Sequence, residues 1–444
     1  MHGKYAVIVL LLAGLAALVF LLVRVERRRA RPEAVSIVEP AAEPVELTAS
    51  RSEVESAAVS ARVLFRCAGD EFEHLTLTSD ARGEKTETWQ KLFVVGANLG
   101  VALPGRYPTE FAAKRADYAR WLEQMGAAGI NVVRVYTILP PEFYQAVAEY
   151  DFRHTERPVY LLQGIWAELP ASGNLLDPAY SSALKREIRD AVDVVAGRAV
   201  LPVRPGSAAG AYSADVSAFT LGYLFGREWE PEAVEATDSV NRAVRRYDGV
   251  LVNVPTGSAT EVWLAGMLDF LAQYEVVTYR TQHPVAFVNW LPLDPMFHPT
   301  EYADRWLTRE SDNDIVTVDP LSIQTTPALR AGYFAAYHVY PYYPDFVFLD
   351  SAYRDFRNAR GEPDNYAGYL SDLKRHSAGL PLLVAEFGVP SSRGNAHHNW
   401  LGMDHGGHNE SEHGPAQPQD AFRHPRPGLR GRRHLRLARR MVQA

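Results

Sequence analysis

The sequence predicts an α/β fold, a (β/α)8 TIM barrel behind an N-terminal transmembrane helix. From Leu92 onward, apolar runs typical of buried strands alternate with helical patterns, which is the form that repeated βα units take in a sequence. Two of these runs, Ala218–Phe225 and Pro381–Ala385, each lead into a glutamate. Because parallel barrels place their chemistry at the carboxyl ends of the strands, both glutamates are expected at one rim.

The first 31 residues predict a membrane anchor with a basic flank. Tyr5–Val23 contains no formally charged residue and is long enough for one membrane-spanning helix. No small-x-small cleavage site precedes the arginines within 24–31, so we interpret the segment as uncleaved. These arginines favour a cytoplasmic position for the rest of the chain. We leave the side of the membrane open, because the activity inferred below is more common outside the cell.

Charge is distributed unevenly along the chain. The net charge of −7 combines +5 in residues 1–31, +7 in residues 414–444 and −19 in residues 32–413. A body this acidic argues against nucleic acid or another polyanion as the partner, and it favours a neutral polysaccharide. The single cysteine, Cys67, excludes an intramolecular disulfide.

The elements expected between the two basic ends follow the apolar pattern. Residues 32–60 predict a flexible acidic linker, part of a region 32–85 that also holds short strands, and the barrel is expected over 86–413. Helices are expected from about Thr109, over Pro178–Ala196 and at about 260–275. The expected strands are, in order, Leu92–Ala97, Asn131–Tyr136, Val159–Trp166, the run that leads to Glu228, Val285–Trp290, Tyr333–Tyr340 and Leu382–Phe387.

An eighth strand is not recognisable in the sequence. After Asn409 the chain becomes rich in Gly, Pro and Arg, and residues 414–444 contain no run that resembles a buried strand. Two interpretations stay open: a disordered basic tail, or a frame slip in the coding sequence near residues 411–414 that replaced the last helix and strand. Translating the nucleotide sequence in the other two frames tests the second interpretation. Under either one, closure of the barrel is in question.

Two glutamates are the candidates for chemistry. Glu386 directly follows the apolar residues Leu382–Ala385, and a carboxylate at the end of a buried strand is costly unless it is used or paired. Glu228 holds the matching place after the earlier run, and two carboxyls at one rim are the minimum for cleaving a glycosidic bond. Glu230 competes with Glu228, because in an extended segment both side chains share a face. We favour Glu228.

The order of these motifs over residues 92–410 resembles the retaining (β/α)8-barrel glycoside hydrolases of clan A, which include the catalytic barrels of families 2 and 5. The resemblance implies that Glu386 is the nucleophile and Glu228 the general acid/base of a double displacement on a β-linked glycan. Arg227 departs from the clan, which usually has an asparagine before its acid/base. That asparagine contacts the 2-hydroxyl of the substrate, so this contact is absent here or comes from elsewhere.

The resemblance also implies which residues bind the substrate. Arg134, at the end of the second strand, would keep Glu386 ionised, and the pair His338 and Tyr340 would orient the nucleophile and line the sugar site. The other candidates lie at the ends of the first, third and fifth strands, and each tryptophan among them either stacks on a sugar or belongs to the core: Asn98, Trp166, Asn289 and Trp290.

Neither a metal nor another cofactor is expected. The loop after Glu386 contains His397, His398, His405 and His408, but their spacing matches no standard zinc signature, and retaining glycosidases need no metal. We therefore predict a membrane-tethered retaining glycosidase whose partner is an oligo- or polysaccharide. Three alternatives remain: a transglycosylase that remodels an exopolysaccharide, a carbohydrate-binding barrel without catalysis, and a structural membrane protein with a decayed barrel.

Overall fold

The computed structural model describes residues 46–79, 85–300, 315–341, 343–344 and 346–388. The predicted anchor at residues 5–23, the histidine-rich loop after Glu386 and the tail at 414–444 lie outside these residues, so what the sequence predicts for them stays a prediction. Among the helices in the described ranges, none has both the length and the apolar character needed to cross a bilayer.

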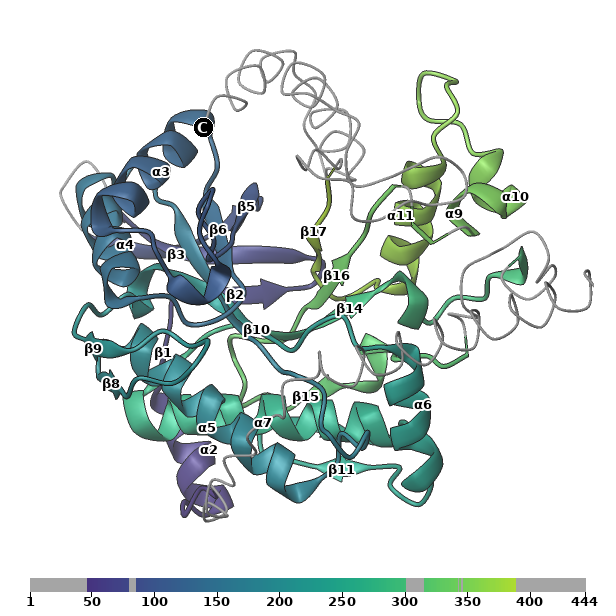
Figure 1. Cartoon of the computed structure of the whole chain (residues 1–444), viewed down its shortest axis with the longest axis horizontal. Coiled ribbons are helices and arrows are strands. Elements are labelled where there is room, and N and C mark those ends of the chain that lie inside the picture. The colour runs from purple at the N-terminus through teal and green to yellow at the C-terminus, as the bar shows by residue number, and fades with distance from the viewer. Residues whose placement is uncertain (1–45, 80–84, 301–314, 342, 345, 389–444) are drawn as a thin grey trace, which may run out of the picture. The chain divides into compact units, whose positions relative to one another are not determined.

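The centre of the fold is a sheet of seven parallel strands whose order in space is their order along the chain (Figure 1). This order is the one that consecutive βα units produce. The strands are β5 (Gly96–Leu99), β6 (Val132–Val135), β7 (Tyr160–Ile165), β10 (Thr220–Phe225), β14 (Val285–Trp290), β16 (Ala335–His338) and β17 (Leu382–Glu386). Each of the last six lies within an expected strand, so the sequence located them correctly.

The two edge strands of this sheet, β5 and β17, approach each other through side chains. The Asn98 side chain on β5 donates a hydrogen bond to the Ala385 carbonyl on β17, at 3.1 Å. The Arg134 side chain on β6 donates to the same carbonyl, also at 3.1 Å. The sheet is therefore a nearly closed barrel of seven strands in the described residues, and a regular (β/α)8 barrel would have its eighth strand at this junction.

The first expected strand, Leu92–Ala97, is wrong in its limits. The chain forms two strands around it, because β4 (Lys85–Leu92) ends where the expected strand begins and β5 starts only at Gly96. β4 belongs instead to an antiparallel sheet with β2 (Phe65–Ala68) and β3 (Glu71–Ser79).

Two phenylalanines of this antiparallel sheet pack edge to face on rings at the amino ends of barrel strands. These pairs are Phe65 with Tyr160 at 4.8 Å and Phe72 with Phe334 at 5.0 Å between ring centroids. The small sheet thus covers the end of the barrel opposite to the predicted chemistry.

The predicted linker over residues 32–60 is wrong for its last ten residues. They form α2 (Arg51–Ser60), which starts with a capping box made by Ser50 and Glu53. Val54, Ala57 and Ala58 are buried on one face of this helix, which packs against α7 (Ala259–Tyr279). Alanine and glutamate favour a helix as strongly as they suit a polar linker, and only the tertiary contact with α7 decides between the two.

Helices connect most of the barrel strands. The expected helix over Pro178–Ala196 is α5 (Pro178–Val195), whereas the one expected from Thr109 starts only at Arg115, after a short 3-10 turn at Pro108–Glu110. The remaining α-helices are α3 (Arg115–Ala128), α4 (Pro141–Arg153), α6 (Pro231–Val240), α9 (Phe346–Leu349), α10 (Ser351–Arg354) and α11 (Asn365–His376). Small strands form accessory pairs: β1 (Arg62–Val63) with β13 (Thr281–Gln282), β8 (Ala199–Leu201) with β9 (Gly210–Tyr212), and β11 (Tyr247–Asp248), β12 (Val252–Val254) and β15 (Gln324–Thr325) together.

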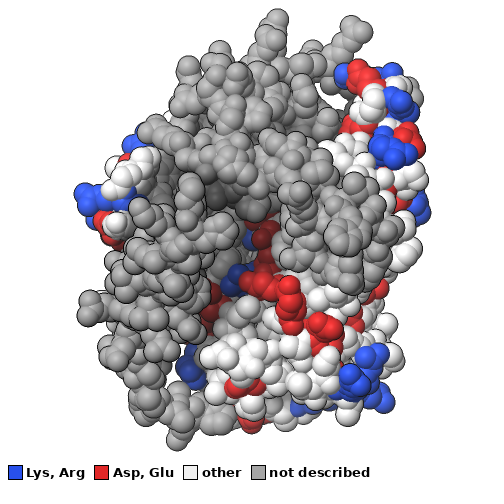
Figure 2. Space-filling model, turned by 45° about the vertical axis from the view of Figure 1, so that its right-hand side comes forward, with Lys and Arg blue, Asp and Glu red and all other residues white. Residues whose placement is uncertain are grey.

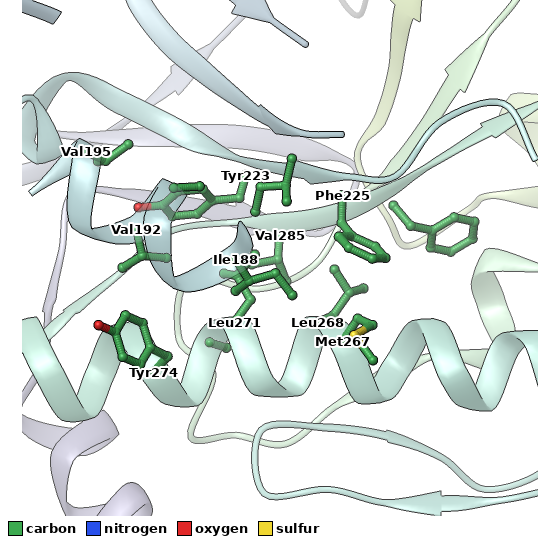
Figure 3. Close-up of a cluster of buried hydrophobic side chains, with 14 of the residues drawn as sticks. Ile188, Val192, Val195, Tyr223, Phe225, Met267, Leu268, Leu271, Tyr274 and Val285 are labelled. Atoms are coloured by element: carbon green, nitrogen blue, oxygen red, sulfur yellow. The ribbon is translucent and has the colours of Figure 1, made fainter. Parts of the chain in front are cut away.

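Buried apolar side chains fill the space between α7 and the sheet on this side of the barrel. Figure 3 shows side chains of α7 pointing toward residues of α5, β10 and β14, among them Leu268, Leu271, Ile188, Phe225 and Val285. α7 is apolar nearly all round because it is covered by α2 as well as by α5 and the sheet. The packing fixes the carboxyl end of β10, from which the chain continues to Glu228.

Candidate active site

The predicted site residues gather where the parallel strands end. Glu386 is the last residue of β17 and His338 the last residue of β16, and Glu228 follows β10 by three residues. Parallel strands end at the same rim, so these side chains from distant parts of the chain meet there. Figure 2 shows acidic side chains, with a few basic ones among them, near the middle of the face that it displays.

The loop that carries Glu228 is fixed by a glycine and a buried tryptophan. Gly226 has a φ of +91°, and a Cβ at this position would lie 2.6 Å from Cζ2 of Trp229. Trp229 is fully buried against the ring of Trp263, and its backbone carbonyl accepts a hydrogen bond of 2.8 Å from Nε1 of Trp290. Glu228 is therefore held between a left-handed turn and an anchored side chain.

Glu228 and Glu386 share one partner, the imidazole of His338. Nδ1 of His338 lies 2.8 Å from Oε1 of Glu228 and 3.0 Å from Oε2 of Glu386. One carboxylate oxygen from each glutamate and a ring nitrogen of His338 all lie within 4.8 Å of one another. A single sugar carbon can therefore approach both carboxyl groups.

Glu386 is held by two further contacts. The Tyr340 hydroxyl donates to its Oε1 at 2.8 Å, and NH1 of Arg134 lies 3.5 Å from its Oε2. Burial by itself raises the pKa of Glu386, but hydrogen bonds from His338 and Tyr340 and the charges of His338 and Arg134 outweigh it and lower the pKa to about 2. Glu386 is thus an ionised carboxylate at neutral pH.

The two cationic partners of Glu386 are both buried. Burial lowers the pKa of His338, yet the hydrogen bonds to Glu228 and Glu386 outweigh this effect, so that the net shift is upward and favours the imidazolium. Burial also lowers the pKa of Arg134, whose guanidinium nevertheless keeps its charge. Both residues therefore stabilise negative charge on Glu386.

Tyr136 belongs to this site, although the sequence analysis did not select it. The guanidinium of Arg134 lies 4.5 Å from the centroid of the Tyr136 ring. The pKa of Tyr136 is raised by burial first, and then by the charge of Glu386 and a hydrogen bond to it. The sequence pattern could have indicated Tyr136, because residues two apart on a strand share a face and Tyr136 follows Arg134 by two.

Glu228, and not Glu230, is the carboxyl that the structure brings to Glu386. Glu230 stands at the start of α6, where its Oε1 accepts a hydrogen bond of 2.8 Å from NH2 of Arg227. The two glutamates have different side-chain partners, His338 for Glu228 and Arg227 for Glu230. Arg227 binds Glu230 and, at 3.3 Å, Glu168 on the neighbouring loop.

The remaining candidates divide into rim and core. Asn98 reaches the backbone beside Glu386, and Trp166 is 39% exposed after the end of β7. Trp290 stacks on Tyr343 and supports the backbone of Trp229. Asn289 is not brought to the site: it is buried, its amide donates to the Val318 carbonyl at 2.9 Å, and its Oδ1 accepts from the Trp290 amide at 2.9 Å.

Three side chains of the site are of the types that can bind a metal ion. In the part of the chain that the structure describes, Glu228, His338 and Glu386 form the one group of metal-ligating side chains close enough to hold an ion. A divalent cation would have to displace the proton that the raised pKa of His338 retains, and it would lie beside the guanidinium of Arg134. The arrangement therefore suits a carboxylate, imidazolium and carboxylate better than a metal.

Comparison with known proteins gives structural likeness only. No protein-family model and no curated protein matches the sequence. Similar solved structures include a GH2 β-galacturonidase from Eisenbergiella tayi, with 12% identity, a TM-score of 0.41, and coverage of 81% of this chain and 44% of that one. An endo-1,4-β-mannanase from Rhizomucor miehei has 11% identity and a TM-score of 0.40, with coverage of 74% and 83%. An endo-laminarinase from Formosa has 12% identity and a TM-score of 0.37, with coverage of 74% and 73%.

This chain therefore spans less than half of the galacturonidase but most of the mannanase and the laminarinase. These three solved structures, to which the chain is similar, are glycoside hydrolases.

Proposed function

We propose that the chain is a retaining glycoside hydrolase that acts on a β-linked, neutral glycan. The observation that carries this proposal is the approach of the Glu228 and Glu386 carboxylate oxygens to within 4.8 Å. Retaining enzymes hold their two carboxyl groups about 5–5.5 Å apart, whereas inverting enzymes leave about 6.5–9.5 Å for a water molecule. The spacing in this site supports the retaining arrangement.

The reaction has two displacements. In the first, Glu386 attacks the anomeric carbon and forms a glycosyl ester, while Glu228 gives its proton to the departing glycosidic oxygen. In the second, Glu228 takes a proton from water, the hydroxide oxygen bonds to the anomeric carbon, and the Glu386 carboxylate leaves. Each residue ends in its starting protonation state, and the configuration at the anomeric carbon is retained.

The electrostatics support this division of roles. A nucleophile must be ionised, and the pKa of Glu386 is lowered to about 2 by His338, Tyr340 and Arg134 acting against burial. Glu386 is contacted by Tyr340 and Arg134 as well as by His338, whereas Glu228 forms its hydrogen bond with His338. Two carboxyls in one site with different partners are the usual arrangement for an acid and a nucleophile.

The membrane part of the proposal comes from the sequence alone. We infer that residues 5–23 tether the barrel to a membrane, on a side that the sequence leaves open. Membrane fractionation of the full chain, followed by protease protection of the barrel in intact cells or vesicles, tests both points. Recovery of the full chain in the soluble fraction would contradict the tether.

A mechanism-based 2-fluoroglycoside tests the catalytic proposal. We expect the full chain to form a stable glycosyl ester with a reagent of suitable sugar, and peptide mapping to place that ester on Glu386. Reagents of several neutral sugars are needed, because loop geometry decides which sugar fits. Binding of a glycan without labelling by any reagent would favour the carbohydrate-binding barrel, and neither binding nor labelling would favour a structural protein.

Product analysis then separates hydrolysis from transfer. A hydrolase releases the β-anomer first, which proton NMR detects before mutarotation, whereas a transglycosylase yields products longer than the substrate. Release of the α-anomer from a β-linked substrate would contradict the retaining mechanism.

A further inference from the structure

Arg227 departs from the expected asparagine, and the structure gives its side chain a fixed set of partners. All three of its side-chain nitrogens donate hydrogen bonds: Nε to the Glu228 carbonyl at 3.2 Å, NH1 to Glu168 at 3.3 Å and NH2 to Glu230 at 2.8 Å. Its side chain is only 22% exposed. Arg227 is thus a paired cation, held directly beside the proposed acid/base.

These pairs leave Arg227 poorly placed to bind a carboxylate on a substrate. A guanidinium recognises a carboxylate through two parallel N–H donors, and each terminal nitrogen of Arg227 already gives one of its two N–H groups to a glutamate, Glu168 or Glu230. The two glutamates also outnumber the one cation, so this part of the rim carries net negative charge. An acidic sugar would meet repulsion here, and a neutral sugar would not.

The same cluster holds an aromatic ring in place. Nε1 of Trp166 donates to Oε1 of Glu168 at 2.8 Å, and the Arg227 guanidinium lies over the Trp166 ring, 5.4 Å from its centroid. Trp166 still exposes 39% of its surface. Arg227 lies over one face of the ring and Glu168 holds its Nε1 edge, so stacking with the C–H face of a neutral pyranose would use the rest of the ring.

We propose that Trp166, Arg227, Glu168 and Glu230 form a subsite for a neutral sugar ring beside Glu228. In this subsite Trp166 makes the stacking contact. Glu168, whose side chain is 77% exposed, accepts hydrogen bonds from sugar hydroxyls. Arg227 is a positioning residue that orients Trp166, and its pairing with two carboxylates keeps it from acidic sugars. The inference rests on the proposed function and names the residues that would give its preference for neutral sugars.

Binding to a turnover-deficient full chain tests the subsite without requiring catalysis. Isothermal titration calorimetry gives the affinities of the parent variant, Glu386→Gln. The ligands are neutral tetrasaccharides (cello-, manno-, xylo- and galacto-) and tetrasaccharides that contain glucuronate or galacturonate. We expect a neutral tetrasaccharide to bind, and Trp166→Ala in the same background to weaken it about tenfold. We expect the acidic sugars to bind at least about tenfold more weakly than the neutral one. The Glu168→Gln and Glu230→Gln double variant, which frees Arg227, should narrow that difference.

Phe152→Ala in the same background is the matched control. Phe152 is 81% exposed and lies at the carboxyl end of α4, next to the start of β7 rather than its end, so its removal should leave the affinity unchanged. Circular dichroism melting verifies that each variant is folded. Equal affinity of the parent and Trp166→Ala, a preference for acidic sugars, or no binding of any neutral tetrasaccharide would each overturn the subsite. Labelling of Glu386 in the wild-type chain would still stand in those cases, so the two proposals fail separately.

Discussion

Glu228 and Glu386 lie far apart in the sequence, yet one nitrogen of His338 is within 3.0 Å of a carboxylate oxygen from each. This shared contact affects both glutamates. The imidazolium stabilises the negative charge of Glu386, and its second contact holds Glu228 near Glu386, as the proposed double displacement would need.

Replacing each glutamate should give a different pattern of loss. Glu386→Ala removes the nucleophile, so turnover should fall to background on every substrate. Glu228→Ala removes the proton donor, so hydrolysis of a natural glycan should fall by about 10²- to 10⁴-fold. Aryl glycosides with good leaving groups need no proton, and their first step should be spared. Initial rates on both substrate types measure the difference, and equal losses on the two would contradict the role of Glu228.

Glu230→Gln is the matched control for Glu228. Its carboxylate pairs with Arg227 at the start of α6, so at saturating substrate the variant should keep the ratio of kcat on natural and activated substrates, whatever its effect on glycan binding. A selective loss of kcat on natural glycans in Glu230→Gln would mean that Glu230 is the acid.

Tyr340→Phe should change the pH dependence at the acid side. The Tyr340 hydroxyl donates to Glu386 and helps to lower its pKa to about 2, so the variant should raise that pKa by about one unit. Glu386 attacks only when ionised, and a higher pKa therefore moves the acid limb of kcat/KM to higher pH. The rate of labelling by an activated fluoroglycoside between pH 2.5 and 6 measures the shift.

Tyr107→Phe provides the control, because Tyr107 is 76% exposed and lies on a loop between β5 and α3. Its pH profile should coincide with that of the wild type. An acid limb in Tyr340→Phe that coincides with the wild type as well would show that Tyr340 does not set the pKa of Glu386.

Arg134→Leu should reduce both stability and labelling. The variant leaves Glu386 without its guanidinium partner and removes one of two donors to the Ala385 carbonyl, where β17 approaches β5. Breaking a fully buried ion pair costs about 3–5 kcal/mol, and the cost here should be lower because Glu386 is partly exposed to water. Urea unfolding measures the free energy of unfolding, and fluoroglycoside labelling measures the nucleophile.

Arg375→Leu is the comparison on the surface. Its guanidinium pairs with Asp372 on α11 and the side chain is 75% exposed, so the change should cost less than about 1 kcal/mol. Equal unfolding free energies for the two variants would argue that Arg134 contributes no more than a surface arginine.

Gly226→Ala should displace the loop that carries Glu228. The φ of +91° is unfavourable for alanine, and the added Cβ would meet the buried Trp229 ring at 2.6 Å. We expect a loss of about 1–3 kcal/mol in unfolding free energy and a selective loss of activity on natural glycans. Gly173→Ala has a similar φ of +68° but no atom within 4 Å of the new Cβ, so it reports the backbone cost alone. A Gly226→Ala variant no less stable than Gly173→Ala would contradict the close contact.

The sequence alone was sufficient to place most of the barrel strands. Their apolar runs end at polar residues, and burial on both faces of a parallel strand leaves such a run recognisable without knowledge of its neighbours. The sequence-based prediction was wrong at residues 51–60 and 92–97. The composition of the first segment suits a linker as well as a helix, and that of the second suits one strand as well as the ends of two. α2 forms because α7 offers a surface to cover, and β4 ends at Leu92 because β3 pairs with it.

The sequence predicted which polar residues stand at the ends of strands, but it did not predict which side chains they contact. The sequence placed Arg134, His338, Tyr340 and Glu386 at or near the carboxyl ends of strands, as the structure has them, and the resemblance supplied the roles expected of them. Asn289 had the same signal, but the Val318 carbonyl and the Trp290 amide use both of its polar groups in the core. Which of two glutamates would face Glu386 was likewise open in the sequence, because local spacing does not reveal that Arg227 takes Glu230.

By itself, the chain's order of residues determined which carboxyls reach the ends of strands, since strand periodicity is a local property of the backbone. Only the tertiary structure decided which of them meet, how Arg227 is neutralised and where the barrel edges approach. Those outcomes depend on contacts between side chains from distant segments of the chain. Such contacts form only in the folded sheet, where β5 and β17 approach each other.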